Sequence, residues 1–292
     1  MAPKKKTELP TTIEAFIRYG AKLFDKAKLV YGHGTDNAVD EAAWLVLETL
    51  GVPVDSPKLP KRKLTVAERA AVKAIIDKRI ETRKPAAYLL NKAYIQGLSF
   101  YVDERVIVPR SFIGELLPEF DLAHPPKKVL DLCTGSGCLA ILAAHIFSKA
   151  SVDAVDLSAG ALAVAKRNVE EHKLKKRVHL FKGDLFKPLK GKKYDLIITN
   201  PPYVDAPAMK VLPPEYRHEP AMALGSGKDG LDIVRRILKE APKHLTLDGG
   251  LLCEVGRGRE ILEAEYPHLS FLWLDTELSE GEVFWLTRNQ LL

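Results

Sequence analysis

The 292-residue chain has few cysteines and no long apolar run. The three cysteines, Cys133, Cys138 and Cys253, form no C-x-x-C pair, which argues against both a disulfide framework and a cysteine metal site. The eight histidines are scattered, and none has the helical spacing to a carboxylate that a zinc site uses. No apolar stretch reaches the roughly 18 residues that cross a bilayer, and the basic residues 1–6 lack the apolar stretch of a signal peptide. We therefore expect a cytoplasmic protein with no membrane contact and no metal.

Acidic charge is comparatively scarce in the first part of the chain. Residues 1–118 carry 20 Lys and Arg against 14 Asp and Glu, a net charge of +6, whereas residues 119–292 carry 24 of each kind. A basic region beside a neutral one suggests a partner that is acidic or is packed with nucleic acid. A solvated, Lys-rich helical surface explains the same charge, so both interpretations stay open.

Apolar residues recur at helical spacing in the N-terminal part. A first helix is expected after an N-cap at Thr12 and a second over residues 37–50. A third starts at Thr65, where Glu68 completes a capping box. The pattern predicts a small helical domain over residues 1–92, in which we find no catalytic constellation.

The periodicity then changes twice. Alternation with a period of two over residues 94–108 predicts a β-hairpin, which we place in a linker over residues 93–118. Beyond it, over residues 119–292, short apolar runs alternate with helical segments, which predicts a doubly wound parallel α/β sheet closed by an antiparallel hairpin. Seven strands are expected, at residues 128–133, 151–157, 178–181, 194–199, 250–255, 271–276 and 282–287.

The stretch Asn200-Pro201-Pro202-Tyr203 directly follows the apolar run 194–198. Two prolines cannot continue a central strand, so the chain must leave the sheet with its carbonyl groups turned outward. The side-chain oxygen of Asn200 and a neighbouring carbonyl would accept hydrogen bonds from one planar NH2 group, and Tyr203 would offer an aromatic face. A plain turn is the alternative for this stretch taken alone.

Three further features fall at the carboxyl ends of expected strands, where ligands bind in doubly wound sheets. Gly135 and Gly137 allow a tight turn that brings backbone N–H groups close to a ligand. Asp156 follows about 20 residues later, where a carboxylate accepts both ribose hydroxyls, and Asp184 could bind an adenine amino group. Taken singly, Asp156 as a helix N-cap and Asp184 as a turn residue remain alternatives; the common register with Asn200 favours a cofactor site.

The glycine turn lacks the full G-x-G-x-x-G pattern, because Cys133 stands in the place of the first glycine and no third glycine follows Gly137. This counts against a pyrophosphate and therefore against NAD. The pattern from Asp131 to Gly137 resembles the first motif of class I S-adenosylmethionine-dependent methyltransferases. With N-P-P-Y and the helical N-terminal part, the chain resembles the HemK-like protein-(glutamine-N(5)) methyltransferases, over about residues 10–290.

This resemblance implies a Rossmann-like seven-stranded class I methyltransferase sheet, S-adenosyl-L-methionine as cofactor, and methylation of a glutamine side-chain amide. Residues 1–92 would then recognise the substrate and residues 119–292 would form the methyltransferase domain. By motif, the cofactor would be held by Asp131, Cys133, Thr134, Gly135, Gly137, Asp156, Asp184, Leu185 and Asn200. The residues from Asn200 to Tyr203 would be catalytic, and the substrate would be bound by Arg110, Asn200, Tyr203, Glu219 and Pro220. Cys133 in place of Gly, and Leu185 in place of an aromatic residue, suggest altered packing around the adenine.

The resemblance is closest to the branch that acts on ribosomal protein L-three of the large subunit. Residues 31–37 and 108–116 favour this branch, because Ser111 and Phe112 stand where the release-factor branch has Pro and Glu. Contact of the basic N-terminal part with ribosomal RNA is a further expectation. A release-factor glutamine methyltransferase, an adenine amino methyltransferase acting on DNA or RNA, and a non-catalytic binding protein are the alternatives. No recognised nucleic-acid module supports the adenine alternative.

Overall fold

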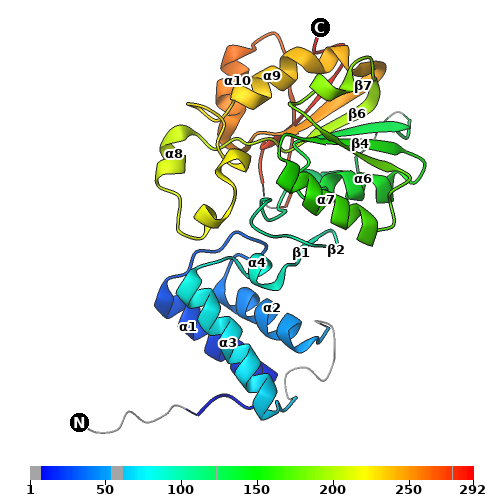
Figure 1. The fold of residues 1–292 in the computed structure, drawn as a ribbon. Helices are drawn as coiled ribbons and strands as arrows, with labels where there is room; N and C mark the ends of the chain where they lie inside the picture. The colour runs from blue at the N-terminus through cyan, green and yellow to red at the C-terminus, as the bar shows by residue number, and fades with distance from the viewer. Residues whose placement is uncertain (1–7, 54–61, 121, 123, 278) are drawn as a thin grey trace. The chain divides into compact units, whose positions relative to one another are not determined.

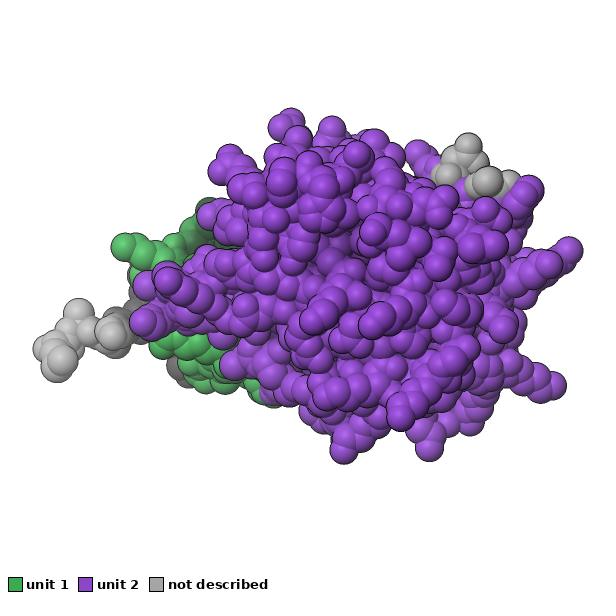
Figure 2. Space-filling view, turned by 90° about the horizontal axis from the view of Figure 1, so that it is seen from above, with its two compact units in different colours: residues 1–91, 213–218 green, residues 92–212, 219–292 purple. Residues whose placement is uncertain are grey.

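A computed structural model describes residues 8–53, 62–120, 122, 124–277 and 279–292. Within these ranges the chain divides into two compact units, which Figure 2 shows in different colours. Unit 1 comprises residues 1–91 and 213–218, and unit 2 comprises residues 92–212 and 219–292. The assignment of substrate recognition, linker and methyl transfer to residues 1–92, 93–118 and 119–292 stays a prediction.

Unit 1 is built from α1 (Ile13–Ala27), α2 (Ala38–Leu50), α3 (Val66–Thr82) and the short α4 (Ala86–Leu90). The caps explain where the helices begin: the Thr12 hydroxyl accepts from the N–H of Ala15, and Thr65 with Glu68 forms the predicted capping box. Apolar side chains of these helices pack into one core. Among the described residues, no helix has the length and apolar character that a membrane crossing requires.

Residues 213–218 belong to unit 1 although they follow Tyr194–Thr199, a strand of the main sheet of unit 2. Their anchor is Glu215, whose side chain is fully buried and lies 2.6 Å from Arg83. Glu215 also accepts a hydrogen bond from the backbone N–H of Val30. Buried Arg79 pairs with Glu41 at 2.8 Å beside it. A buried carboxylate needs such partners, because unpaired charge is costly away from water.

The predicted hairpin is shorter than expected. It consists of β1 (Ala93–Ile95) and β2 (Leu98–Phe100), joined by Gln96 and Gly97, which both have positive φ. Residues 101–108 form no strand, so the expectation of strand structure there is wrong. The Asn168 side chain explains the end of β2, because it accepts from the N–H of Tyr101 and donates to its carbonyl.

Unit 2 contains a seven-stranded sheet in the order β5-β4-β3-β6-β7-β9-β8. The first five of these strands are parallel to one another, and β9 pairs antiparallel with both β7 and β8. The predicted doubly wound α/β fold with a closing hairpin is therefore confirmed. The strands are β3 (Lys128–Leu132), β4 (Ser151–Asp156), β5 (Val178–Lys182), β6 (Tyr194–Thr199), β7 (Leu245–Glu254), β8 (Leu272–Leu274) and β9 (Val283–Thr287).

Helices cover both faces of this sheet (Figure 1). One face packs against α6 (Cys138–Ile146) and α7 (Ala159–Glu171), and the other against α9 (Asp232–Glu240) and α10 (Arg259–Glu265), so two apolar clusters form on opposite faces. The sequence missed α4, α8 (Ala206–Lys210) and α10, whereas α5 (Ile113–Leu116) falls in the segment from Ser111, where the apolar spacing of Ile113, Leu116 and Leu117 predicts a helix. Short 3-10 helices lie at Lys187–Leu189, Tyr216–His218, Ala221–Ala223, Ala241–Lys243 and Gly256–Gly258.

The strand order reverses between β3 and β6. From β3 the chain moves outward to β4 and β5, and then returns to place β6 on the other side of β3. The hydroxyl of Thr199, the last residue of β6, donates to the carbonyl of Leu132, the last residue of β3, at 2.9 Å. The two carboxyl ends therefore meet at the point where an open α/β sheet binds its ligands.

Candidate active site

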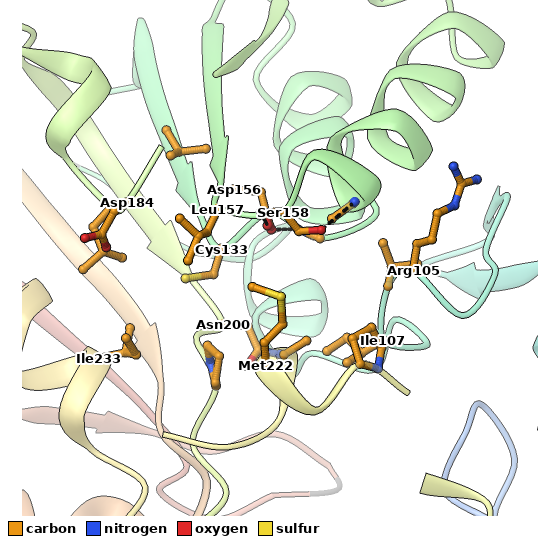
Figure 3. Close-up of a pocket in the computed structure, with 18 of the residues that line it drawn as sticks. Arg105, Ile107, Cys133, Asp156, Leu157, Ser158, Asp184, Asn200, Met222 and Ile233 are labelled. Carbon is orange, nitrogen blue, oxygen red and sulfur yellow. Dashed lines mark hydrogen bonds between the residues drawn. The ribbon is translucent and has the colours of Figure 1, made fainter. Parts of the chain in front are cut away.

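A pocket lies at this edge of the sheet, and most of the predicted cofactor residues line it. Figure 3 shows how Cys133, Asp156, Asp184 and Asn200, which follow or end β3, β4, β5 and β6, face one cavity. Gly135, Leu185, Pro202 and Pro220 also line it, whereas Asp131, Thr134, Gly137, Pro201, Tyr203, Arg110 and Glu219 do not.

The turn after β3 is held from below by Asp131. One of its carboxyl oxygens, Oδ2, accepts from the Thr134 hydroxyl and from the N–H of Ala140, which fixes the turn against the start of α6. Its other oxygen, Oδ1, is buried and has no hydrogen-bond partner among the described residues. Burial raises the pKa of this carboxyl to about 7. An unpartnered carboxyl oxygen beneath a ligand turn is suited to a positively charged group.

Asp156 shapes the wall of the pocket with both of its oxygens. Oδ2 accepts from the N–H of Gly135 at 2.8 Å, and Oδ1 accepts from the N–H of Ser158 at 2.8 Å. The N-cap of α7 is Ser158, whose hydroxyl accepts from Ala161, so the alternative of Asp156 as a helix N-cap is wrong. Burial raises the pKa of the Asp156 carboxyl. Each oxygen retains a lone pair for a ligand, since a carboxylate offers about four acceptor positions.

Asp184 is less available than the sequence suggests. Its carboxylate is bonded to Lys187 and to Arg236, each at 2.7 Å, and these hydrogen bonds lower its pKa. The neighbouring Leu185 lines the pocket with a positive φ of 50°. Cys133, in the turn after β3, also has a positive φ, of 58°. Non-glycine residues in this conformation cost free energy and concentrate at functional sites.

The segment after β6 leaves the sheet as predicted, with Asn200 and Pro202 facing the pocket. Tyr203 is turned elsewhere: its hydroxyl donates to Glu254 at 2.9 Å. The next residue, Val204, pairs with Gly225 in an isolated parallel bridge. The end of the Asn-Pro-Pro-Tyr turn is therefore fixed by the bond from Tyr203 to Glu254 and by the pairing of Val204 with Gly225.

Arg110 and Glu219 meet, although 109 residues separate them in the sequence. The guanidinium donates to Glu219 through two nitrogens, at 2.6 and 2.7 Å, and the backbone N–H of Val108 donates to the same carboxylate at 2.8 Å. The Glu219 side chain is fully buried and that of Arg110 is 24% exposed. The pair therefore joins residues 108–110 to the segment that carries Pro220 into the pocket.

Sequence reasoning missed part of the pocket lining. The missed residues are mainly apolar, and most come from loops: Arg105, Val106, Ile107, Val155, Leu157, Ser158, Ala161, Gly183, Met222, Ala223, Gly225 and Ile233. Leu157 and Met222 are more than half exposed, and large exposed apolar side chains beside a polar edge are a signal for a binding surface only once the fold is known. Within the described ranges, no group of three or more His, Cys, Asp or Glu side chains is arranged to hold a metal ion.

Comparison with known proteins gives one consistent result. The family model of the methyltransferase small domain matches residues 115–212. The chain is 56% identical to the ribosomal protein uL3 glutamine methyltransferase of Bradyrhizobium diazoefficiens, over 97% of this chain and 92% of that protein. It is 52% identical to the protein of the same name from Neisseria meningitidis serogroup B, over 97% of this chain and 95% of that protein.

A solved structure supports the fold. The methyltransferase from Pyrococcus furiosus superposes with a TM-score of 0.52 at 19% identity, over 74% of this chain and 98% of that chain. The resemblance inferred from the motifs is confirmed by the curated relatives, and the chain belongs to the family of ribosomal protein uL3 glutamine methyltransferases.

Proposed function

We propose that this protein transfers a methyl group from S-adenosyl-L-methionine to the side-chain nitrogen, N(5), of a glutamine in ribosomal protein uL3, the L-three protein of the large subunit. The observation that carries the proposal is that Asn200 and Pro202 line the same pocket as Gly135 and Asp156. An acceptor for an amide NH2 group and a cofactor cradle thus share one cavity. The names of the relatives supply the substrate.

The residues of the pocket fit this cofactor. Asp131 does not line the cavity, but its buried Oδ1, which has no hydrogen-bond partner among the described residues, lies under the turn from Cys133 to Gly137 and would attract the ammonium group of the methionine part. The Asp156 carboxylate would accept the ribose hydroxyls with its remaining lone pairs. Leu185, Leu157 and Ile233 offer apolar surface for the adenine; Asp184, already bonded to Lys187 and Arg236, would accept from the adenine amino group with what acceptor capacity it retains.

The chemistry asked of the protein is mainly positional. Bound S-adenosylmethionine would supply an electrophilic methyl group, so no metal or covalent intermediate is required. The side-chain oxygen of Asn200 and the carbonyl of Pro201 would hold the two amide hydrogens and orient the nitrogen lone pair. An amide nitrogen is a poor nucleophile, and acceptors on its hydrogens raise its electron density as the transition state forms.

The other substrate residues act at the edge of this site in our proposal. Pro220 bounds the position of the amide, and Tyr203 supports the turn from outside the pocket through its bond to Glu254. Arg110 and Glu219 neutralise each other and fix the loop that presents Pro220. Because the substrate is a ribosomal protein, we assign the activity to the cytoplasm.

The test is transfer of a labelled methyl group to three substrates: unmodified uL3, a release factor, and DNA or RNA containing adenine. Label on one glutamine of uL3 is the expected result. Label on the release factor alone would keep the chemistry and overturn the substrate. Label on nucleic acid alone would mean that the pocket accepts an adenine amine, not an amide, and would refute the proposal.

We also propose that the basic N-terminal part contacts ribosomal RNA when uL3 is presented in an assembling particle. The supporting observation is the charge of +6 confined to residues 1–118. Arg62 is already paired with Glu68, and Lys61 lies outside the described residues. Replacing Lys61, Arg62 and Lys63 by Gln should slow modification of uL3 in a particle and reduce its salt dependence; deletion of residues 1–9 should have little effect. An unchanged rate after the triple substitution would mean that the charge only solvates the surface.

A further inference from the structure

A buried carboxyl group, Glu254, lies at the end of β7 next to the Asn-Pro-Pro-Tyr turn. Its side chain is 1% exposed and receives three hydrogen bonds. The Tyr203 hydroxyl donates to Oε1 at 2.9 Å; the Ser111 hydroxyl, at 2.6 Å, and the N–H of Phe112, at 3.0 Å, donate to Oε2. None of the sequence motifs includes this residue.

The first of these bonds reaches the proposed amide site directly. Tyr203 is the fourth residue of the turn that begins at Asn200, and its ring packs against Gly256, where a Cβ atom would lie 2.8 Å from two ring carbons. Gly256 has a positive φ of 52°, which an L side chain rarely adopts. The Tyr203 ring therefore packs directly on the backbone of Gly256, and its hydroxyl is bonded to Glu254.

The other two bonds reach the segment that follows Arg110. Ser111 and Phe112 follow Arg110, which with Val108 holds the Glu219 carboxylate. Pro220, the next residue, lines the pocket. Glu254 thus connects the turn that carries Asn200 to the segment that fixes Pro220.

Stability alone is a weak explanation for this arrangement. Burial raises the pKa of the Glu254 carboxyl to about 7, and nearby Glu282 adds to the effect. A buried acid is unfavourable compared with a well-packed apolar side chain of similar volume. Three geometrically fixed acceptor positions are what such a side chain supplies and an apolar one does not.

We propose that Glu254 is a positioning residue for methyl transfer: by holding Tyr203 and residues 111–112, it keeps the acceptors of Asn200 and Pro201 aimed at the substrate amide. The inference rests on the proposed function. It predicts that loss of the link lowers turnover without weakening the cofactor, because the contacts of Asp156 and Gly135 are untouched. Small errors in the placement of reacting groups cost large factors in rate.

The first variant to test is Tyr203→Phe, which removes the hydroxyl and keeps the ring on Gly256. Its matched control is Tyr194→Phe. Tyr194 is the first residue of β6, whereas Tyr203 follows the last residue of that strand, and the Tyr194 hydroxyl donates to the buried carboxylate of Asp153 at 2.8 Å. Each variant would be measured for thermal unfolding, cofactor affinity, uL3 affinity in the presence of S-adenosylhomocysteine, and kcat. We expect both to lower Tm by a similar amount, and Tyr203→Phe alone to lower kcat by at least about tenfold, with both affinities within about twofold.

A second pair of variants separates positioning from acid–base chemistry. In Glu254→Gln, the amide oxygen can accept from Ser111 and Phe112 while its NH2 group donates to the Tyr203 oxygen, so kcat should stay within about threefold of wild type. Glu254→Ala removes all three bonds and should lower kcat at least as much as Tyr203→Phe. The double variant Glu254→Ala with Tyr203→Phe should lower kcat no further than Glu254→Ala alone, because both changes break the same bond between Tyr203 and Glu254.

Three results would overturn the proposal: an unchanged kcat in folded Tyr203→Phe, an equal loss of kcat in Tyr194→Phe, or a Glu254→Gln variant as inactive as Glu254→Ala. The last would indicate that the ionised acid itself is needed. Failure of the proposed function is distinguishable from these, because wild-type protein would then label no glutamine of uL3, whatever the variants do.

Discussion

Asp156→Asn tests the cofactor site with the smallest possible change. The variant keeps the size and shape of the side chain but replaces one carboxylate oxygen by an NH2 group. Both oxygens of Asp156 accept backbone N–H groups, from Gly135 and Ser158 at 2.8 Å each. Whichever way the amide turns, its NH2 group therefore faces a backbone donor, and one of the two contacts with the ribose is lost as well.

The expected loss follows from these contacts. A hydrogen bond to a charged group contributes about 1–3 kcal/mol, so cofactor affinity should fall roughly 5- to 150-fold. Calorimetric titration with S-adenosylmethionine and with S-adenosylhomocysteine measures this directly. Both ligands carry the ribose, so both should weaken by the same factor.

Asp195→Asn is the control away from the pocket: one carboxylate oxygen of Asp195 accepts two backbone N–H groups, from Lys127 at 2.9 Å and Lys128 at 3.0 Å, and the other accepts from the Thr246 hydroxyl at 3.1 Å. Asp195 is the second residue of β6 and lies at the opposite edge of the sheet from Asn200. We expect this variant to bind the cofactor normally. Unchanged affinity in Asp156→Asn, or an equal loss in Asp195→Asn, would refute the assignment of Asp156 to the ribose.

Three more predictions concern the rest of the site. Asn200→Ala should lower methyl transfer by more than about 100-fold while cofactor affinity stays within a few-fold; retained activity would rule out the amide-holding role. Arg110→Met leaves the buried Glu219 carboxylate without its two-nitrogen partner and should cost about 2–3 kcal/mol in urea unfolding, and a cost below about 1 kcal/mol would mean that Val108 suffices. The Glu254 carboxyl, with its pKa raised by burial from 4.5 to about 7, binds its proton more tightly in the folded protein, so unfolding free energy should fall as pH rises through this window and level off above it. Glu254→Gln should flatten that fall, measured by denaturant unfolding near pH 5 and near pH 8; an equal pH slope in both proteins would contradict the shift.

The sequence predicted those parts of the fold that depend on local pattern. The strands that end at Asp156 and Thr199, and the capping box of Thr65 and Glu68, were identified because apolar periodicity and cap chemistry are local properties. The register of four polar features at four strand ends then placed the pocket. Residues 101–108 were assigned wrongly, because the apolar alternation there reflects burial of Val102, Val106 and Val108 and not pairing with another strand.

What the sequence did not reveal are contacts between distant segments. Glu219 pairs with Arg110 across 109 residues, and Glu254 bonds Ser111 across 143. Glu215 is buried beside Arg83 in the helical unit, although the chain before residue 213 and after residue 218 belongs to the other unit. Each of these acids is indistinguishable in sequence from a solvated surface residue, since only the fold supplies the partner that allows a charge to be buried.

Cys133 shows why a departure from the usual motif need not change the chemistry. Its φ of 58° is one that glycine adopts freely, whereas an L side chain loses about 1–2 kcal/mol there. The side chain lines the pocket and packs against the apolar cluster beneath the sheet, so it fills space that a glycine would leave open. Burial, with the charges of Asp156 and Asp131, holds the thiol pKa far above its usual range, and a protonated thiol is a poor nucleophile. We therefore infer that the cysteine contributes apolar surface to the cofactor pocket and does not accept the methyl group as an intermediate.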